Sequence, residues 1–263
     1  MAPVGGSAEA QDILYGLHAV REALKAGHRP LQRILVLRTD KQFTDLVQLA
    51  RSRRVPIHVQ PLESFDRLVP HGKHQGVVAF AAAKAYQTEE SILARAAARH
   101  EPPLVVLLDG VEDPHNLGAV LRTAEGAGSH GVFIPERRAA GLTSVVAKAS
   151  AGAIDHIPVA RVTNMSRSIE SLKAAGVWIY GVTPSAKKLF TDVDFRGPIG
   201  LVLGGEGMGI RRGVLQHCDD CVRIPLRGKV QSLNVSASAA IVLYEAVRQR
   251  GCSNQHAGDS PDS

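Results

Sequence analysis

The sequence predicts a two-domain α/β protein whose second domain is built on a mostly parallel sheet. Its 263 residues exceed the size of one ordinary domain and suit two. Hydrophobic residues make up 44% of the chain and aromatic residues only 4%, which is typical of aliphatic strands between helices. From residue 104 onward, strands that are apolar throughout alternate with helical patterns, as in a parallel sheet covered on both faces.

The first predicted domain spans residues 13–83, after a segment at 1–12 that we expect to be disordered. Leu17, Val20 and Leu24 share one face of a helix that Gly27 closes. Strand and helix patterns then alternate up to residue 81. The further elements expected here are a strand at 33–37, a helix at 43–50, a strand at 55–59, a short helix at 61–69 and a strand at 76–81.

The second predicted domain spans 104–250 and follows a linker at 84–103. The linker is polar, alanine-rich and ends in Glu-Pro-Pro, which cannot continue a helix, although a short helix at 89–99 fits within it. Residues 251–263 are expected to form a disordered tail. The second domain is expected to contain strands at 104–108, 131–134, 156–159, 177–182, 199–203 and 221–224, and helices at 116–126, 144–151, 166–175, 211–217 and 232–249.

The charge of the chain favours a polyanionic partner. The formal net charge is +6, and residues 1–100 hold 14 Lys and Arg against 9 Asp and Glu, whereas the remainder is nearly balanced. Basic side chains gain affinity for nucleic acids because neutralised phosphates release counterions. No apolar run approaches the length of a membrane span, and the first residues do not form a secretory signal, so we expect a cytoplasmic protein without a membrane partner.

The three cysteines do not indicate a disulfide framework. Cys218 and Cys221 form a lone C-x-x-C, which holds only half the ligands of a typical structural zinc site, and Cys252 stands alone. We interpret the pair as ordinary thiols at a helix end and in the following strand. A metal or redox role is the weaker alternative.

The first of three candidate turns in the second domain reads Asp-Gly-Val-Glu-Asp-Pro-His-Asn-Leu-Gly-Ala, at 109–119. It leads from a strand to a helix, and open parallel sheets bind ligands outside the carboxyl ends of their strands. Asn116 is a natural N-cap, and Arg122 lies six residues further along the helix. Taken alone, the two residues are equally well explained as a cap and a solvated charge.

The second turn is the glycine-rich run Leu-Gly-Gly-Glu-Gly-Met-Gly-Ile at 203–210. Its glycine spacing differs from G-x-G-x-x-G, and no Walker lysine and hydroxyl pair follows, which disfavours ordinary NAD and NTP sites. The run favours a backbone loop around another nucleotide. Glu206 has little packing role among so many glycines, which favours a functional carboxylate.

The third turn, at 224–238, enters the last predicted helix with small and hydroxyl residues. It reads Ile-Pro-Leu-Arg-Gly-Lys-Val-Gln-Ser-Leu-Asn-Val-Ser-Ala-Ser. Ser232 and Asn234 suit simple helix caps. So many polar groups at the start of an otherwise apolar helix also suggest a helix N-terminus that faces a ligand.

Together the three turns resemble the motifs of the SpoU/TrmH (SPOUT) family of RNA 2′-O-methyltransferases. The matching runs, 116–124, 201–210 and 224–236, agree with the family in residue type, order and spacing. The likeness covers about residues 103–250. The N-terminal part, with Tyr-Gly-Leu-His-Ala-Val from residue 15 and His-Gln-Gly-Val from residue 74, resembles the family's substrate-binding domain, which is similar to ribosomal protein L30e.

The resemblance implies a fold, a cofactor and an assembly. The fold is an α/β trefoil knot, in which the C-terminal segment threads through a loop, a rare exception to chain topology. S-adenosylmethionine would lie against the knot, and the reaction would need no metal. The protein would be a homodimer in which both subunits complete the site. The residues implied in cofactor binding are Gly204, Ile224 and Leu233, with their neighbours Gly205 and Gly209.

The resemblance also marks Arg122 as the residue that acts on the ribose 2′-hydroxyl. A guanidinium holds its proton too firmly to be an easy base. We therefore expect Arg122 to grip a neighbouring phosphate and to stabilise the developing alkoxide. The residues expected to orient Arg122 and the ribose are Asn116, Glu206, Ser232 and Asn234.

Within the family, the combination of domains is most similar to bacterial 23S rRNA guanosine 2′-O-methyltransferases that act on the P loop of the peptidyl-transferase centre. The partner would be 23S rRNA or a large-subunit assembly intermediate, and no DNA is expected. A tRNA enzyme, a resistance-type rRNA enzyme acting on another nucleotide and a noncatalytic ribosome-assembly protein are the alternatives. The basic residues expected to hold RNA in the first domain are Arg51, Arg53, Arg54, Lys73 and His74.

Overall fold

The computed structural model describes residues 11–70 and 72–254, which form two compact units. Of the described residues, the first unit contains those up to Ala85 together with the segment Leu142–His156. The second contains Tyr86–Gly141 and the described residues from Ile157 onward. Among the described residues, no helix combines the length and the apolar character that crossing a membrane requires.

The first unit is a four-stranded sheet in the order β1-β4-β2-β3. β4 pairs antiparallel with β1 and β2, and β2 pairs parallel with β3. The leading strand was not predicted, and its residues 11 and 12 correct the expectation of disorder there; residues 1–10 lie outside the described residues. The elements are β1 (Gln11–Tyr15), α1 (Leu17–Ala26), β2 (Leu31–Val36), η1 (Lys41–Phe43), α2 (Thr44–Ser52), β3 (Ile57–Val59), α3 (Leu62–Leu68) and β4 (Val77–Ala82).

The segment 142–156 packs on α1 and β1 of the first unit, although the sequence assigned it to the second domain. It forms α6 (Ser144–Ala149) and η2 (Ala153–Asp155). Asp155 is buried and forms an ion pair with the buried Arg29, whose Nε lies 2.9 Å from Asp155 Oδ1. Buried charges of this kind must be paired, so the ion pair holds the segment on the first unit.

The second unit is a seven-stranded sheet in the order β7-β6-β5-β10-β8-β11-β9. Every pairing between the described strands is parallel. The central strands are buried along nearly their whole length, as their aliphatic sequences predicted. The strands are β5 (Leu104–Asp109), β6 (Gly131–Pro135), β7 (Val159–Val162), β8 (Trp178–Val182), β9 (Lys188–Leu189), β10 (Ile199–Gly204) and β11 (Asp220–Arg223).

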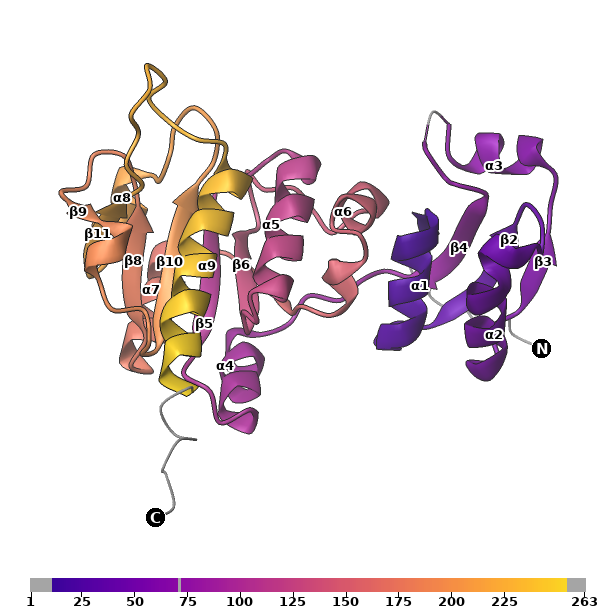
Figure 1. Ribbon diagram of the computed structural model, residues 1–263, viewed down its shortest axis with the longest axis horizontal. Coiled ribbons are helices and arrows are strands. Elements are labelled where there is room, and N and C mark those ends of the chain that lie inside the picture. The colour runs from indigo at the N-terminus through magenta and orange to yellow at the C-terminus, as the bar shows by residue number, and fades with distance from the viewer. Residues whose placement is uncertain (1–10, 71, 255–263) are drawn as a thin grey trace, which may run out of the picture. The chain divides into compact units, whose positions relative to one another are not determined.

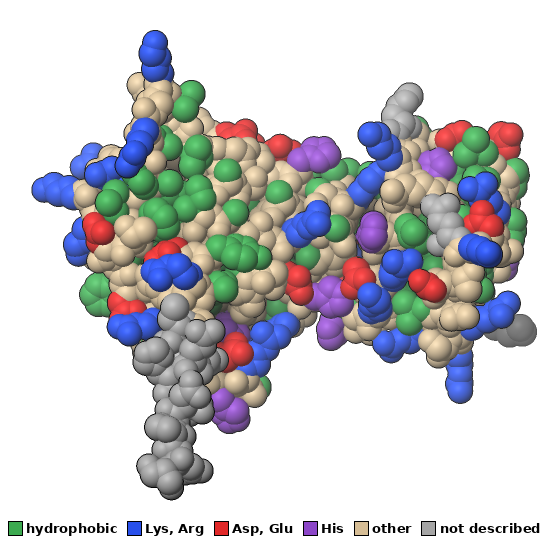
Figure 2. All heavy atoms as spheres, in the orientation of Figure 1, with side chains coloured by type: hydrophobic (Ala, Val, Ile, Leu, Met, Phe, Trp, Pro, Cys, Tyr) green, Lys and Arg blue, Asp and Glu red, His purple; other side chains and the backbone are tan. Residues whose placement is uncertain are grey.

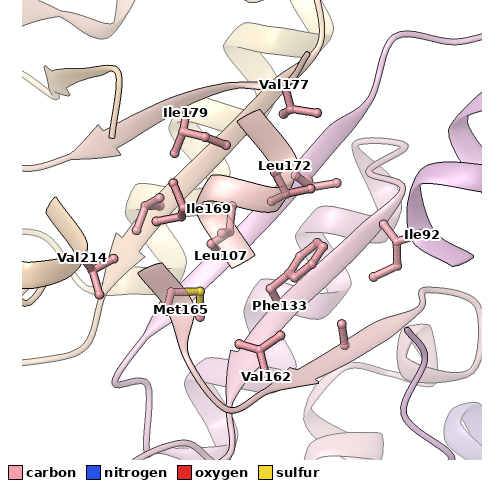
Figure 3. Packing of buried hydrophobic residues seen from close by; sticks show 13 residues of the cluster. Ile92, Leu107, Phe133, Val162, Met165, Ile169, Leu172, Val177, Ile179 and Val214 are labelled. Carbon is pink, nitrogen blue, oxygen red and sulfur yellow. The ribbon is translucent and has the colours of Figure 1, made fainter. Parts of the chain in front are cut away.

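Helices cover both faces of this sheet (Figure 1). α5 and α9 pack together on one face, whereas α4, α7 and α8 lie on the other. On the second face, Ile169 and Leu172 of α7 pack against Leu107 and Phe133 (Figure 3). The helices and 3-10 turn are α4 (Glu89–Ala98), α5 (Pro114–Gly126), α7 (Met165–Ala174), η3 (Phe190–Asp192), α8 (Arg212–Leu215) and α9 (Val235–Asn254).

α4 belongs to this core, although its residues fall in the predicted linker. Ile92 of α4 is fully buried in the same cluster. A Cβ added at Gly131 would lie 2.6 Å from the Ile92 side chain, so the helix sits directly on β6. The stretch from residue 86 to 103 is therefore part of the second unit.

Two further boundaries differ from the prediction. The strand expected at 156–159 begins only at Val159, because Gly152–His156 is occupied by the η2 turn and its caps. The last helix continues to Asn254, which corrects the expected disorder at 251–254, while 255–263 lie outside the described residues. The trefoil knot implied by the resemblance stays a prediction.

Candidate active site

The three candidate turns meet at one edge of the second sheet because the strands they follow are parallel. β5 leads into the first turn, β10 into the second and β11 into the third. The carboxyl ends of parallel strands share an edge, and this is where such sheets bind ligands. Residues about 90 to 120 positions apart in the chain are thereby brought into contact.

Asn116 is not the N-cap that the sequence predicted. α5 begins earlier, at Pro114, and the Asp113 carboxylate caps it by accepting a hydrogen bond of 2.9 Å from the backbone N–H of His115. A proline in the first turn costs nothing, since its missing N–H would have had no helical partner. Asn116 consequently lies inside the helix, only 8% exposed, with its amide free to bind elsewhere.

The amide of Asn116 joins a closed network with Glu206 and Asn234. Its Nδ2 donates to Glu206 Oε1 at 2.5 Å. Asn234 Nδ2 donates to Asn116 Oδ1 at 3.0 Å and to Glu206 Oε1 at 3.1 Å. One residue from each turn is therefore fixed by the other two, and within the described part of the chain the second carboxylate oxygen of Glu206 makes no hydrogen bond.

Asn234 is also the residue that caps α9. Its Oδ1 accepts hydrogen bonds from the backbone N–H of Ser236 at 2.8 Å and from the Ser236 hydroxyl at 2.6 Å. The capping and the site interpretations of this residue both hold, because the two ends of one amide serve them separately. Ser236 itself was not among the predicted site residues.

The glycine-rich loop after β10 requires glycine for steric reasons. A Cβ on Gly204 would lie 2.0 Å from the backbone carbon of Gly209, and one on Gly205 would lie 1.8 Å from the carbonyl oxygen of Gly110. Gly207 and Gly209 have φ of +82° and +62°, which side chains rarely adopt. The loop folds tightly against the first turn and presents Glu206 toward Asn116.

Asp109 and Arg211 form an ion pair that the sequence did not reveal. Asp109 ends β5, and its buried carboxylate accepts from the backbone N–H and the Nε of Arg211, both at 2.8 Å. The carboxylate raises the pKa of the Arg211 guanidinium. The pair holds the far end of the glycine-rich loop against β5 and so supports the network.

A cleft of about 830 Å³ opens beside the network, within the ordinary size range of small-molecule sites. Its described lining contains aliphatic and hydroxyl side chains and the carboxylate of Glu206, but no lysine or arginine. Such a lining suits a ligand without phosphates. All five residues expected to bind the cofactor line this cleft, namely Gly204, Gly205, Gly209, Ile224 and Leu233.

Comparison with known families decides between the possible ligands and reactions. A model described as the SpoU rRNA Methylase family matches residues 103–244, and one described as RNA 2′-O ribose methyltransferase substrate binding matches residues 13–87. The chain belongs to the SpoU family. It is an S-adenosylmethionine-dependent RNA 2′-O-methyltransferase, which confirms the predicted family, enzyme class and cofactor.

Relatives match nearly the whole length of this SpoU chain. A Bacillus subtilis protein whose name assigns it to the TrmH family of tRNA/rRNA methyltransferases is 43% identical over 240 residues, 91% of this chain and 96% of its own. The 23S rRNA (guanosine-2′-O-)-methyltransferase RlmB of Shewanella oneidensis is 40% identical over 245 residues, 91% and 98% of the two chains. The SpoU methyltransferase AviRb from Streptomyces viridochromogenes, crystallised with AdoMet, has a TM-score of 0.78 at 26% identity and covers 91% of this chain and 90% of its own.

The cleft fits the cofactor of the SpoU family. S-adenosylmethionine carries positive charge and no phosphate, and among the described lining residues the charged side chain is the carboxylate of Glu206. The backbone of the glycine-rich loop is uncovered because Gly207 and Gly209 have no side chain there. Ser232 also lines this cleft, without a hydrogen bond from its side chain to other described residues.

Arg122 does not join the network within one chain. It lies six residues after Asn116 on α5, which places the two side chains about 120° apart around the helix. Its side chain is exposed and has no ion pair or hydrogen bond with the described residues. The structure thus brings together three of the five predicted catalytic residues, places Ser232 at the cleft and leaves Arg122 facing outward.

The five predicted RNA-binding residues fall into two groups on the first unit. Arg51, Arg53 and Arg54 are exposed at the end of α2, and Arg51 and Arg54 line a hollow of about 440 Å³. The Arg53 guanidinium donates to the backbone oxygen of Lys25 at 2.9 Å, which fixes it in place. Lys73 is exposed on the loop before β4.

His74 is placed less favourably for RNA. Its side chain is only 13% exposed, stacks on Phe65 with ring centroids 5.2 Å apart, and lies 3.4 Å from a carboxylate oxygen of Asp66. Its Nδ1 accepts from the backbone N–H of Gly76. These contacts give His74 a structural role in holding the loop.

The prediction did not include basic residues at two further places, one in each unit. Lys148 of α6 donates to the backbone oxygen of Lys73 and lies 4.7 Å from the ring of Tyr15, an arrangement that only folding reveals. In the second unit, Arg227 and Lys229 are exposed on the loop between β11 and α9. Figure 2 shows basic side chains at the outer end of this loop, beside the cleft whose wall it forms.

Proposed function

We propose that the protein methylates the 2′-hydroxyl of a guanosine in the peptidyl-transferase P loop of 23S rRNA. The RlmB relative, 40% identical along almost its entire length, is named as a 23S rRNA (guanosine-2′-O-)-methyltransferase, and this observation carries the assignment. A substrate-binding region at 13–87 supports a large RNA substrate. The substrate is either free 23S rRNA or a large-subunit assembly intermediate.

The residues that would hold the cofactor are those of the cleft. The backbone groups of Gly204, Ile224 and Leu233 would contact it, and the absence of a Cβ at Gly204 and Gly205 allows the close backbone approach that shapes the loop. When bound, S-adenosylmethionine supplies a methyl group on a sulfonium, which is already activated for transfer. The protein therefore has to place the ribose and support the charge that develops on its oxygen.

In this proposal, the Asn116, Glu206 and Asn234 network places the ribose. The second carboxylate oxygen of Glu206 remains open to accept a hydrogen bond from the 2′-hydroxyl. Arg122 grips the adjacent phosphate with its planar guanidinium and stabilises the developing alkoxide. Ser232, at the edge of the cleft, contributes a hydroxyl to the same orientation.

We further propose that the enzyme is a homodimer whose Arg122 serves the site of the partner subunit. Arg122 faces outward from α5, away from the network of its own chain. α9 packs beside α5 and exposes 53% of Tyr244, so this face offers both an apolar side chain and the missing charge. A second copy bound here completes a site that one chain leaves without its cation.

Replacing Arg122 with Lys tests the role of the planar guanidinium group, which can donate two parallel hydrogen bonds. The lysine keeps the charge but cannot bind a phosphate through two parallel N–H groups. We expect single-turnover methyl transfer to fall by about 100-fold while cofactor affinity is unchanged. Near-normal turnover by this variant would remove the bidentate contact from the mechanism.

The substrate is tested by offering labelled S-adenosylmethionine with separated rRNA and tRNA pools. We expect label in 23S rRNA, at a guanosine of the P loop when the position is mapped by primer extension. Label only in tRNA would establish the tRNA alternative. Label at another 23S nucleotide would establish the resistance-type alternative.

A further inference from the structure

A second cleft opens at the same edge of the second sheet, over the carboxyl ends of β6 and β7. Its volume is about 590 Å³. None of its described lining residues lines the cofactor cleft. Its lining includes Arg137 after β6, Asn164 after β7 and Arg211 before α8.

The charge of this cleft is opposite to that of the cofactor cleft. Arg137 and Arg211 line it, and the exposed Arg138 and Arg212 follow each of them in the chain. Glu136 is the acidic residue in the described lining. A recess bordered by several arginines attracts phosphate oxygens, which accept charge-assisted hydrogen bonds from guanidinium groups.

The arginines differ in what already holds them. Arg211 is fixed by the buried Asp109 carboxylate, so it forms a rigid wall of the cleft. The exposed Arg137 makes no ion pair or hydrogen bond with its side chain among the residues described. A guanidinium without a partner among the described residues, beside a fixed one, is available to an external anion.

The position of the cleft relates it to the reaction site. In the sheet order, β6 and β10 are separated by β5 alone, so the carboxyl ends of these two strands lie about 10 Å apart along the sheet edge. Glu206 follows β10 and Arg137 follows β6 at that edge. One RNA strand can therefore reach both places.

We propose that this second cleft binds a backbone phosphate of the RNA strand that carries the target ribose. The inference rests on the proposed function and extends it, since it assigns Arg137 and Arg138 to holding the substrate strand on the second unit. Phosphate contacts fix the register of a nucleic acid and carry no sequence information. The cleft thus positions the strand, while recognition of the nucleotide lies elsewhere.

The experiment compares the wild-type enzyme with Arg137→Ala and Arg137→Ala/Arg138→Ala. Affinity for a fluorescein-labelled 23S rRNA fragment is measured by anisotropy at several salt concentrations. For the double variant we expect RNA affinity to fall by about 10-fold or more and the salt slope to fall by about 1 per arginine. Affinity for S-adenosylmethionine should stay at the wild-type level.

Arg99→Ala is the matched control, because Arg99 is an exposed arginine that caps the end of α4, before β5 and so at the opposite edge of the sheet. Arg137→Lys keeps the charge and should retain most of the affinity, which excludes misfolding as the cause of a loss. If Arg137→Ala/Arg138→Ala binds RNA as tightly as Arg99→Ala, the proposal is wrong. The binding readout needs no methyl transfer, so its outcome is separate from that of the proposed function.

A competition distinguishes an RNA backbone from a free phosphate compound. AMP is added at constant ionic strength to the wild-type enzyme with the labelled RNA. We expect RNA binding to be unchanged, because an extended strand makes many contacts at once. Displacement of RNA down to the level of Arg137→Ala/Arg138→Ala would overturn the assignment in favour of a small phosphate ligand.

Discussion

Asn116 shows how one residue's position within a helix decides its role. Because Asp113 caps α5, the amide of Asn116 is buried and bound to Glu206 and Asn234 instead of to backbone N–H groups. In the cap position its Oδ1 would be engaged by backbone N–H groups, as that of Asn234 is, and only Nδ2 would be left for the network. The N-cap lies three residues earlier than predicted, and this leaves both ends of the Asn116 amide to the site.

Replacing Asn116 with Ala should impair methyl transfer more than folding. The network loses two hydrogen bonds, which leaves the Glu206 carboxylate free to move, and misplacement of a positioning group can cost about 100-fold in rate. We expect single-turnover methyl transfer to fall by about that factor with an unchanged circular dichroism spectrum. His115→Ala, next to it and exposed, is the control; equal rates for both variants would contradict the role of the network.

His130 makes the stability of the second unit depend on pH. Its ring is 1% exposed, Nδ1 accepts from the backbone N–H of Leu104 at 3.1 Å, and Nε2 lies 3.0 Å from Glu101. Burial lowers the pKa of His130 below its usual value of 6.5, and Glu101 only partly opposes this. Protonation of Nδ1 would also break the hydrogen bond to Leu104.

Below pH 6.5 His130 is therefore protonated in the unfolded chain but stays neutral in the folded chain until its lowered pKa is reached. The free energy of unfolding should fall as the pH decreases, by up to about 1.4 kcal/mol per unit, until the lowered pKa is passed. Above pH 6.5 this contribution should be fully present. Denaturant unfolding of His130→Gln should show a weaker pH dependence than that of His217→Gln, which alters a more exposed ring; identical dependences would show that His130 is not the cause.

At the scale of elements, the site depends on loops that touch backbone to backbone. Gly205 follows β10, and its N–H donates to the carbonyl of Asp109 at the end of β5. The Arg211 side chain then returns from the same loop to the Asp109 carboxylate. The parallel pairing of β5 and β10 is thus extended into the site.

Gly205→Ala should separate these loops. The added Cβ would lie 1.8 Å from the carbonyl oxygen of Gly110, and backbone cannot rotate aside as a flexible side chain can. We expect the free energy of unfolding to fall by about 1–3 kcal/mol and the affinity for S-adenosylmethionine to fall with it. Calorimetry should find no such change for Gly197→Ala, where an added Cβ meets nothing within 4 Å; if Gly205→Ala matches this control, the close approach is not a constraint.

The sequence predicted most elements of the second unit because its strands are apolar along their whole length and its helices have clear periods. It missed β1, whose five residues Gln11–Tyr15 are stabilised by pairing with β4 and have no distinctive pattern of their own. It also misassigned 142–156, because the ion pair between Arg29 and Asp155 joins residues far apart in the chain. Local pattern does not report contacts of that kind.

At the site, the fold brings residues of all three motifs together. Glu206 and Asn234 contact Asn116, and the residues expected to bind the cofactor line one cleft, while their roles stay predictions. The motifs gave no sign that Arg122 faces away, since its direction depends on where α5 starts and on helix geometry. Asp109 and Arg211 were missed because each looks like an ordinary turn residue until the two loops meet.

At the scale of the whole molecule, the proposed sharing of Arg122 between subunits is testable by mixing inactive variants. Arg122→Ala and Glu206→Ala dimers are unfolded together and refolded. Half of the dimers should then be mixed, and each mixed dimer should hold one intact site, so activity should return to about one quarter of the wild-type level.

A second mixture, of Glu206→Ala with Asn234→Ala, is the matched control. Both residues belong to the network of one chain, so neither subunit of a mixed dimer has an intact site and activity should stay absent. Failure of the first mixture to regain activity would show that Arg122 acts within its own chain or that the enzyme does not work as a dimer.

The position of the transferred methyl group on the nucleotide shows whether the network directs it to a ribose oxygen. 23S rRNA is incubated with the enzyme and labelled S-adenosylmethionine and is then digested with alkali, which cannot cleave beside a 2′-O-methylated ribose. We expect label in an alkali-resistant dinucleotide that yields 2′-O-methylguanosine, and no such product with Glu206→Ala. Label recovered in mononucleotides as a methylated base would contradict it.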